Sequence, residues 1–140
     1  MEAQALAKRI VDAMYNNDPM SQCLGIERIT DGPGISVLQM RIRKEMLNGF
    51  SIAHGGIAYS LADSALAFAA NSHGIQSVSI ETAISHVSPA KEGDVLRTLV
   101  EEKNLTQRTG LYHVTVLNQD NKVLAYFKGT VFRTGKAWEV

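Results

Sequence analysis

The fold is decided by the stretch HGGIAYSLADSALAFAANS, which covers residues 54–72. Its richness in Ala and Leu predicts a helix over about residues 56–72. Large apolar side chains stand on nearly every side of that helix: Ile57, Tyr59, Leu61, Leu66 and Phe68. A helix that is hydrophobic all round is buried, so the rest of the chain has to supply the layer that surrounds it.

The residues after this helix change to the two-residue periodicity of strands. Four strands are predicted in the C-terminal part, within about residues 76–133. On the first of them, alternation is expected to place one set on a common face: Val78, Ile80, Thr82, Ile84 and His86. Residues 119–122 predict a hairpin turn between the last two strands. Consecutive strands joined by short turns favour an antiparallel sheet.

The residues before the central helix predict a helix, a strand and a loop. Apolar residues at three- and four-residue steps from Ala3 to Met14 predict an amphipathic helix over about residues 2–17. Residues 31–34 predict a turn, and the alternation over residues 38–42 predicts a strand with one wet face. Residues 44–56, with three glycines, predict a loop.

These elements predict an α+β fold in which a curved antiparallel sheet wraps around the long central helix. With 140 residues, no repeat and no linker, the chain is expected to form one domain over residues 1–140. The outer face of such a sheet needs a cover, which favours a dimer or tetramer.

Composition excludes several classes of function. Fourteen basic and fourteen acidic residues cancel, so no nucleic acid or membrane partner is expected. Cys23 is the only cysteine, which excludes an internal disulfide and a thiolate zinc site. The histidines show no close-paired spacing, so no metal is expected. The first eleven residues lack the apolar core of a signal peptide, and residues 57–70 are too short and interrupted to span a bilayer. A cytoplasmic protein is therefore expected.

Asp63 is the only charged residue between Gly55 and Ser72. A lone buried carboxylate is costly, and proteins tolerate that cost where the group has a chemical task. Asp63 also belongs to a polar seam at helical spacing, with Ser60, Ser64 and Asn71. The seam indicates either a polar cleft or a contact with solvent or a partner helix, and the pattern leaves both open.

The segment His54-Gly55-Gly56 precedes the helix. The first amides of a helix lack internal acceptors and carry partial positive charge, and glycines let a substrate approach them closely. Such an amide can hold the oxyanion that forms when a carbonyl is attacked. Asp63 is expected to lie within reach of the same carbonyl. The alternative is a tight loop entry at the glycines, with His54 only a helix cap.

Several short motifs occur in a familiar order and spacing. They are Met46-Leu47-Asn48-Gly49, His54-Gly55-Gly56, Ser60-Leu61-Ala62-Asp63, Ser88-Pro89-Ala90-Lys91-Glu92-Gly93-Asp94, Thr109-Gly110 and Phe127-Lys128-Gly129. Together they resemble the hotdog-fold acyl-CoA thioesterases, and most of all the phenylacetate-degradation, PaaI-like group. The resemblance runs from about residue 24 to residue 133.

The resemblance implies roles for individual residues. The residue at Asp63 attacks the thioester or activates water, and the Gly55 amide holds the oxyanion. Asn48 fixes the carbonyl or the water, and His54 orients the cluster. Ser79 matches a position that, in some members, reaches in from the neighbouring subunit. The resemblance also implies a site at a dimer interface and a homotetramer built as a dimer of dimers.

The implied substrate is a medium-chain or aromatic, phenylacetyl-like acyl-CoA, hydrolysed to the free acid and CoA. CoA is then part of the substrate and no cofactor is expected. Gly56 and Ser88 are expected to contact the substrate, although Ser88 stands where the family often has arginine. Lys91, Arg108 and Arg133 are candidates to hold the CoA phosphates in its place.

Two alternatives to a thioesterase remain: a non-catalytic acyl-CoA-binding hotdog module, and a hotdog dehydratase or hydratase.

The sequence also predicts the surroundings of two other residues. His86 is expected to be a hydrogen-bonded strand histidine, with a place in the acyl pocket as the alternative. Trp138 is expected to lie in a loosely held tail.

Overall fold

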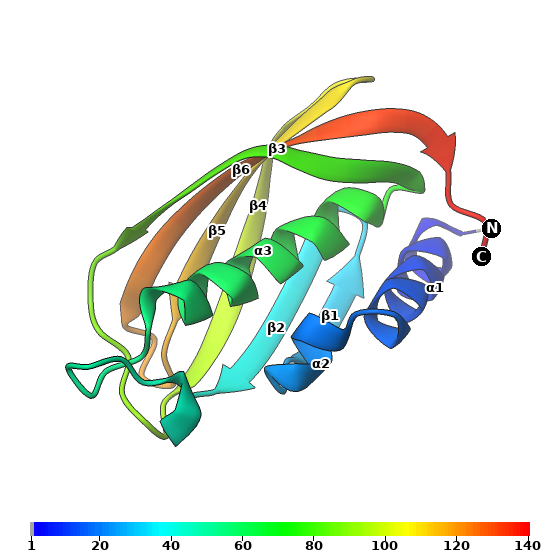
Figure 1. Cartoon of the computed structure of the whole chain (residues 1–140). Helices are drawn as coiled ribbons and strands as arrows, with labels where there is room; N and C mark the ends of the chain where they lie inside the picture. The colour runs from blue at the N-terminus through cyan, green and yellow to red at the C-terminus, as the bar shows by residue number, and fades with distance from the viewer. Residues whose placement is uncertain (1) are drawn as a thin grey trace.

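The computed structural model describes residues 2–140. One six-stranded antiparallel sheet curves around a central helix, as Figure 1 shows. The strand order is β1-β2-β4-β5-β6-β3. The strands are β1 (Glu27–Gly32), β2 (Ile35–Arg41), β3 (Ile75–His86), β4 (Val95–Leu105), β5 (Thr109–Leu117) and β6 (Val123–Ala137). The helices are α1 (Ala3–Asn16), α2 (Pro19–Cys23), the short 3-10 helix η1 (Lys44–Met46) and the central α3 (Gly55–Asn71).

Helix α3 is buried against the concave face of the sheet, as its composition predicts. Leu61, Leu66 and Phe68 are almost fully buried, and alanines fill the remaining inner positions. Gly129 on β6 lies directly under Leu66, so closely that a Cβ at residue 129 would collide with the Leu66 side chain. The predicted α+β architecture, a curved antiparallel sheet around a long helix, is therefore confirmed.

Strand β3 differs from the prediction because it contains a bulge. The register against β6 shifts between Ser79 and Glu81, so one extra residue interrupts the alternation. Thr82 and Ile84 face α3, where Thr82 hydrogen-bonds Tyr59. Val78 and Ile80, predicted on the same face, are instead 57% and 61% exposed. A single inserted residue exchanges the two faces of a strand, and the sequence alternation alone did not reveal it.

Two elements were not predicted. Asp18-Pro19 ends α1 but also begins α2, because the Asp18 side chain accepts from the Ser21 amide and Pro19 occupies the first turn. Strand β1 was missed because its residues show little alternation: its only fully buried position is Gly32. Strand β6 also extends to Ala137, beyond the predicted limit of about residue 133.

The expectation of a loosely held tail at Trp138 is wrong. Its backbone amide donates to the Gly74 carbonyl at 2.9 Å, and its indole Nε1 donates to Asn71 Oδ1 at 2.9 Å. The end of the chain is thereby attached to the C-terminal end of α3, beside α1 (Figure 1).

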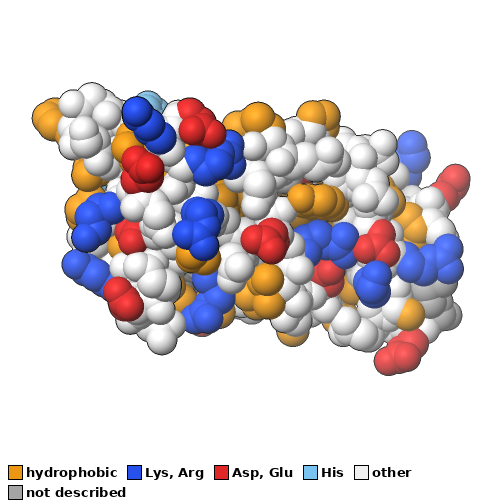
Figure 2. Space-filling model, turned by 90° about the horizontal axis from the view of Figure 1, so that it is seen from below, with side chains coloured by type: hydrophobic (Ala, Val, Ile, Leu, Met, Phe, Trp, Pro, Cys, Tyr) orange, Lys and Arg blue, Asp and Glu red, His pale blue; other side chains and the backbone are white. Residues whose placement is uncertain are grey.

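Surface charge follows the balanced composition. Positive and negative side chains alternate across the face seen in Figure 2, and no single sign dominates it. Within residues 2–140, no helix has the length and apolar character needed to cross a membrane.

Candidate active site

The N-terminus of α3 presents one unoccupied amide. His54 is the N-cap, and its Nδ1 accepts from the Gly56 amide at 3.0 Å. The His54 carbonyl accepts from the Ile57 amide at 2.9 Å. The Gly55 amide has no acceptor among residues 2–140. It is therefore a free donor at the positive end of a helix, as an oxyanion site requires.

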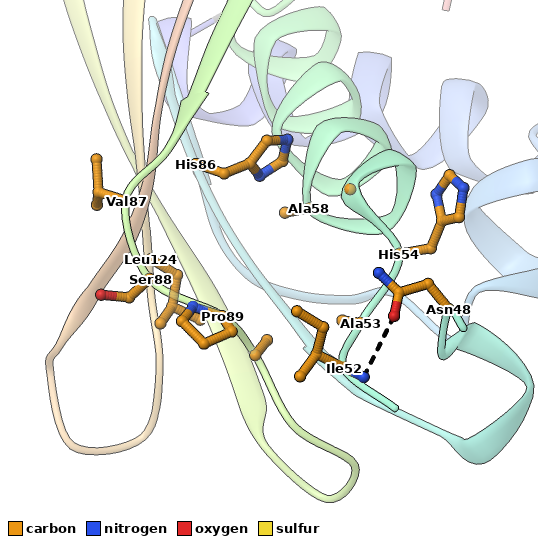
Figure 3. Close-up of a pocket in the computed structure, with 12 residues that line it drawn as sticks. Asn48, Ile52, Ala53, His54, Ala58, His86, Val87, Ser88, Pro89 and Leu124 are labelled. Carbon is orange, nitrogen blue, oxygen red and sulfur yellow. Dashed lines mark hydrogen bonds between the residues drawn. The ribbon is translucent and has the colours of Figure 1, made fainter. Parts of the chain in front are cut away.

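A cavity of about 430 Å³ opens at this amide. Three regions build it, as Figure 3 shows: the loop before α3, the first turn of α3, and the end of β3 with the segment that follows. The lining residues are Asn48, Ile52, Ala53, His54, Gly55, Ala58, His86, Val87, Ser88, Pro89, Ala90 and Leu124. The structure thus brings together four predicted site residues: Asn48, His54, Gly55 and Ser88.

Asn48 uses one end of its side chain to shape the loop. Its Oδ1 accepts from the Phe50 amide at 2.9 Å and from the Ile52 amide at 3.4 Å (Figure 3). Its Nδ2 makes no hydrogen bond within the described residues. The carbonyl end therefore holds the loop, while the amino end remains a donor for a ligand.

Asp63 lies in a second, smaller cavity. This cavity measures about 260 Å³ and is lined by Met14, Asp63, Leu66, Ala67, Asn71, Ser77, Val78, Ser79 and Val131. The Asp63 carboxylate makes no hydrogen bond or ion pair in the part of the chain that is described. Burial, and to a lesser degree the negative charge of Asp18, raises the pKa of the Asp63 carboxyl. Predicted residue Ser79 lines the same cavity.

The polar seam of α3 is divided between two environments. Ser64 Oγ hydrogen-bonds Ser21 Oγ at 2.8 Å, and Ser21 Oγ donates to Asp18 Oδ2 at 2.6 Å. This part of the seam meets a partner helix, α2, which is one of the two alternatives that the sequence left open. Asp63 and Asn71 border the cavity, which matches the other.

Within one chain, Asp63 and the Gly55 amide do not share a cavity. They are eight residues apart on α3, which corresponds to about 12 Å along the helix axis. The expectation that both reach the same carbonyl is therefore wrong for a single subunit.

The other predicted substrate-binding residues lie in different places, and not all of them reach the first cavity. The Gly56 amide is occupied by His54, so Gly56 is not a free donor. Lys91 follows Ala90, which lines the first cavity. Arg108 and Arg133 lie away from it: the Arg133 amide donates to the Arg108 carbonyl at 2.7 Å, and Arg133 Nη1 donates to the Thr106 carbonyl at 2.7 Å. These two arginines close the β4–β5 turn instead.

His86 is a functional candidate for which the sequence predicted a place in the cavity only as the alternative. Its ring makes no hydrogen bond within residues 2–140, contrary to the expectation of a hydrogen-bonded strand histidine. It lines the first cavity and points toward the start of α3 (Figure 3). It shares that face with Thr82 and Ile84, as the two-residue alternation predicts, because the bulge lies before Thr82. No group of three or more potential metal-binding side chains occurs among the described residues.

The fold and the site together define the class: a hotdog-fold protein with a free amide at the N-terminus of its central helix and a carboxylate on the same helix. Residues 50–125 match the thioesterase superfamily. The chain belongs to that superfamily.

The relatives are consistent with this assignment. The acyl-coenzyme A thioesterase PaaI of Escherichia coli is 37% identical over 88% of this chain and 88% of its own length. The structure of that protein, from the phenylacetic acid degradation operon, superposes with a TM-score of 0.94 at 34% identity, covering 97% of this chain and 99% of the other. A variant of the phenylacetic acid degradation protein PaaI from Thermus thermophilus superposes with a TM-score of 0.80 at 36% identity, covering 83% of this chain and 99% of the other. A Streptococcus mutans protein bound to acetyl CoA superposes with a TM-score of 0.78 at 26% identity, covering 81% of this chain and 91% of the other.

Three predictions are thereby confirmed: the hotdog fold, the resemblance to the PaaI-like thioesterases, and the assignment of the chain to thioester hydrolases.

Proposed function

We propose that this chain hydrolyses an acyl-CoA thioester to the free acid and CoA. The observation that carries the proposal is the free Gly55 amide at the start of α3, facing a cavity that Asn48 and Ser88 also line. The relatives support the substrate class, since one is an acyl-coenzyme A thioesterase and another binds acetyl CoA.

In the proposed reaction, the thioester carbonyl accepts from the Gly55 amide and from Asn48 Nδ2. A thioester carbonyl is electrophilic and its thiolate leaves readily, so one carboxylate and a preorganised oxyanion site suffice. Asp63 either attacks the carbonyl carbon, which expels the CoA thiolate and leaves a mixed anhydride that water hydrolyses, or removes a proton from a water that attacks the carbonyl and expels the thiolate directly. His54 positions the site because its ring caps α3 and occupies the Gly56 amide, which leaves Gly55 as the free donor.

A second copy of the chain is proposed to supply Asp63 to the Gly55 cavity. Strand β3 is the edge of the sheet, and it exposes Val78 and Ile80 beside Ser79 of the Asp63 cavity. A long edge strand with exposed apolar residues is a pairing surface. An isologous dimer through β3 would set two α3 helices antiparallel, with Asp63 of each opposite Gly55 of the other. The predicted dimer of dimers would add a contact on the outer sheet face.

The acyl group is proposed to be medium-chain or aromatic. The cavity beside Asp63 has apolar walls from Met14, Leu66 and Val131. Its volume, about 260 Å³, accommodates a phenylacetyl-sized group. The CoA portion would leave past Ser88 and Lys91 at the mouth of the Gly55 cavity.

The first test is release of CoA, followed with a thiol-reactive dye, from a panel of acyl-CoAs by the wild-type protein and Asp63→Ala. Asp63→Ala should stay folded and lose at least about a hundredfold in rate, roughly 2.7 kcal/mol of barrier. If the wild type releases no CoA from any acyl-CoA, the thioesterase proposal fails. Acyl-CoA binding without turnover would then favour the non-catalytic module.

The second test asks whether the site is shared between subunits. Asp63→Ala and Asn48→Ala chains are each inactive in a shared site, but a mixed dimer contains one intact site. After subunit exchange, the mixture should recover about a quarter of wild-type activity, since half of the dimers are mixed and each has one good site. No recovery, with mixed dimers demonstrated, would place the whole site in one chain.

A further inference from the structure

His86 stands next to the free amide of Gly55. A Cβ built on Gly55 would lie 3.2 Å from His86 Nε2, closer than to any other atom of the ring. The glycine therefore leaves space that the imidazole edge occupies. Since a residue's amide nitrogen and Cβ are bonded to the same Cα, they are about 2.5 Å apart. His86 Nε2 thus lies within a few ångströms of the Gly55 amide nitrogen.

The His86 ring is available to a ligand. Neither ring nitrogen has a hydrogen-bond partner in residues 2–140, whereas His54 Nδ1 is occupied by Gly56 and His73 Nε2 by Glu102. His86 also lines the cavity that the Gly55 amide faces, and Figure 3 shows its ring directed at the first turn of α3. The backbone amide of Gly55 and the side chain of His86 therefore lie close to the same part of the cavity.

The backbone around His86 is held in place. His86 pairs with Ala125 at the end of β3, and the amides of Val87 and Ser88 both donate to the Leu124 carbonyl, at 2.9 and 3.2 Å. A donor fixed by a sheet needs little reorganisation when charge develops on an acceptor.

From this geometry we propose that His86 is a further catalytic residue. Its Nε2–H donates a hydrogen bond to the thioester carbonyl oxygen alongside the Gly55 amide, and this bond strengthens as that oxygen becomes an oxyanion. No proton is transferred; the neutral imidazole acts as a donor only. The inference rests on the proposed thioesterase function and deepens it, since it assigns a side-chain donor to the oxyanion site.

The test compares three variants at residue 86. His86→Gln places an amide nitrogen where Nε2 lies, His86→Asn places one where Nδ1 lies, and His86→Phe keeps the ring shape without a donor. His86→Phe and His86→Asn should lose about a hundredfold in kcat with little change in KM, as for loss of one oxyanion donor. His86→Gln should keep most of the activity. His113→Phe, on the outer face of β5, is the matched control and should match the wild type.

A binding measurement separates contact with the carbonyl from other roles. The probe is a phenylacetyl-CoA analogue in which a methylene replaces the sulfur, so that the ketone is retained and cannot be hydrolysed. Calorimetry should show His86→Phe binding it about three- to tenfold more weakly than wild type. The corresponding analogue with the ketone reduced to a methylene should bind both proteins equally.

Three results would overturn the inference while leaving the thioesterase proposal standing. The first is full activity of His86→Phe in an enzyme whose wild type hydrolyses acyl-CoA. The second is equal weakening of both analogues, which would make His86 a general wall of the cavity. The third is an effect of His86→Phe confined to the acid side of the pH–rate profile, which would place His86 against the partner's carboxylate. Absence of wild-type hydrolysis, in contrast, defeats the function and not the carbonyl contact, which the ketone analogue still tests.

Discussion

Asp63, the residue proposed to act on the thioester, lies in an environment that disfavours its charge. Its carboxylate is partly buried on a helix that has no other charged residue, and the charge of Asp18, which has the same sign, acts on it. Neither an ion pair nor a hydrogen bond within the described residues compensates. A carboxylate kept at a cost to stability is what a nucleophile or a base requires.

Asp63 should therefore reduce stability at neutral pH. Its pKa is raised in the folded protein, so the native state binds more protons than the unfolded state once the pH exceeds the ordinary value of 3.8. Stability is then lost as the pH rises through the two pKa values, and the deficit persists above them. Asp63→Asn should melt a few degrees higher than wild type at pH 7, and calorimetry below pH 3.8 should show the difference closing. An equal difference at both pH values would mean that charge is not its cause.

The same shift predicts a feature of catalysis. In the proposed reaction the Asp63 carboxylate is the active form, so kcat/KM should fall on the acid side with a midpoint above 3.8, the ordinary aspartate value. A pH–rate profile with a midpoint at or below that value would contradict the buried environment of Asp63.

Asn48 has one end that holds the loop and one end proposed to contact the thioester, and substitutions can separate the two roles. Asn48→Asp keeps the acceptor for the Phe50 and Ile52 amides but removes the Nδ2 donor, whereas Asn48→Ala removes both. Asn48→Asp should keep the free energy of unfolding within about 0.5 kcal/mol of the wild-type value and lose about a hundredfold in kcat. Asn48→Ala should in addition lose about 1–2 kcal/mol of stability. Full activity in Asn48→Asp would remove the amide from the site.

At the scale of elements, the packing of α3 into the sheet depends on one missing side chain. Gly129 has no Cβ, and Leu66, 1% exposed, occupies the space where one would lie. Leu66 belongs to the core, so a shift of its side chain would disturb the residues packed around it. Hydrophobic periodicity predicts that Leu66 belongs to the core, but it does not show that residue 129 has to be small.

Gly129→Ala should therefore overpack the core and lower the free energy of unfolding by about 1–3 kcal/mol. Gly49→Ala is the matched control, because nothing lies within 4 Å of a Cβ there and the backbone is not left-handed. Urea unfolding of both variants measures the difference. A Gly129→Ala protein as stable as Gly49→Ala would show that α3 and β6 are less closely packed than described.

The C-terminal end of α3 is held by two polar groups of contacts. Glu102 Oε2 accepts from Tyr112 Oη at 2.7 Å and lies 2.5 Å from His73 Nε2, next to the tight turn at Gly34. Burial and the Glu102 charge raise the pKa of Tyr112, so it stays a donor at all working pH values. Asn71 meanwhile accepts from Trp138 and the Ser77 amide. These contacts lie at the end of α3 opposite the Gly55 cavity, and Asn71 and Ser77 also line the Asp63 cavity, so the second cluster fixes part of its wall.

At the scale of the whole molecule, the exposed edge of the sheet is the feature that the single chain leaves unexplained. Strand β3 is 12 residues long, has one unpaired edge, and exposes Val78 and Ile80. Its Ser79 lines the Asp63 cavity. The surface proposed for dimerisation is thus continuous with the surface proposed for catalysis.

A charged residue introduced on this edge should both separate the subunits and abolish activity. Ile80→Lys removes an exposed apolar contact and places like charges opposite each other across a two-fold axis. Sedimentation should show a smaller species, still folded by circular dichroism, with CoA release reduced about a hundredfold or more. Leu99→Lys, also on an exposed apolar position but on β4, is the control and should leave β3 pairing intact. A fully active monomer of Ile80→Lys would refute the shared site.

By itself, the sequence determined the central helix, the antiparallel character of the sheet and the family. Each rests on local or ordered information: apolar residues on all sides of residues 56–72, two-residue alternation, and motifs at fixed spacing. It also identified Asp63, since a lone charge in an apolar helix is visible without coordinates, and His54-Gly55-Gly56, since helix N-termini have a recognisable chemistry.

Tertiary structure alone decided which of these residues meet. The bulge at Ile80 depends on how β3 and β6 pair, and the approach of His86 to Gly55 depends on how the end of β3 packs beside α3. The occupation of the Gly56 amide by His54, the anchoring of Trp138 on Asn71 and the separation of Asp63 from the Gly55 cavity likewise depend on distances between residues. Periodicity reports which face of an element is apolar, whereas a site is made where several elements bring their side chains to one point in space.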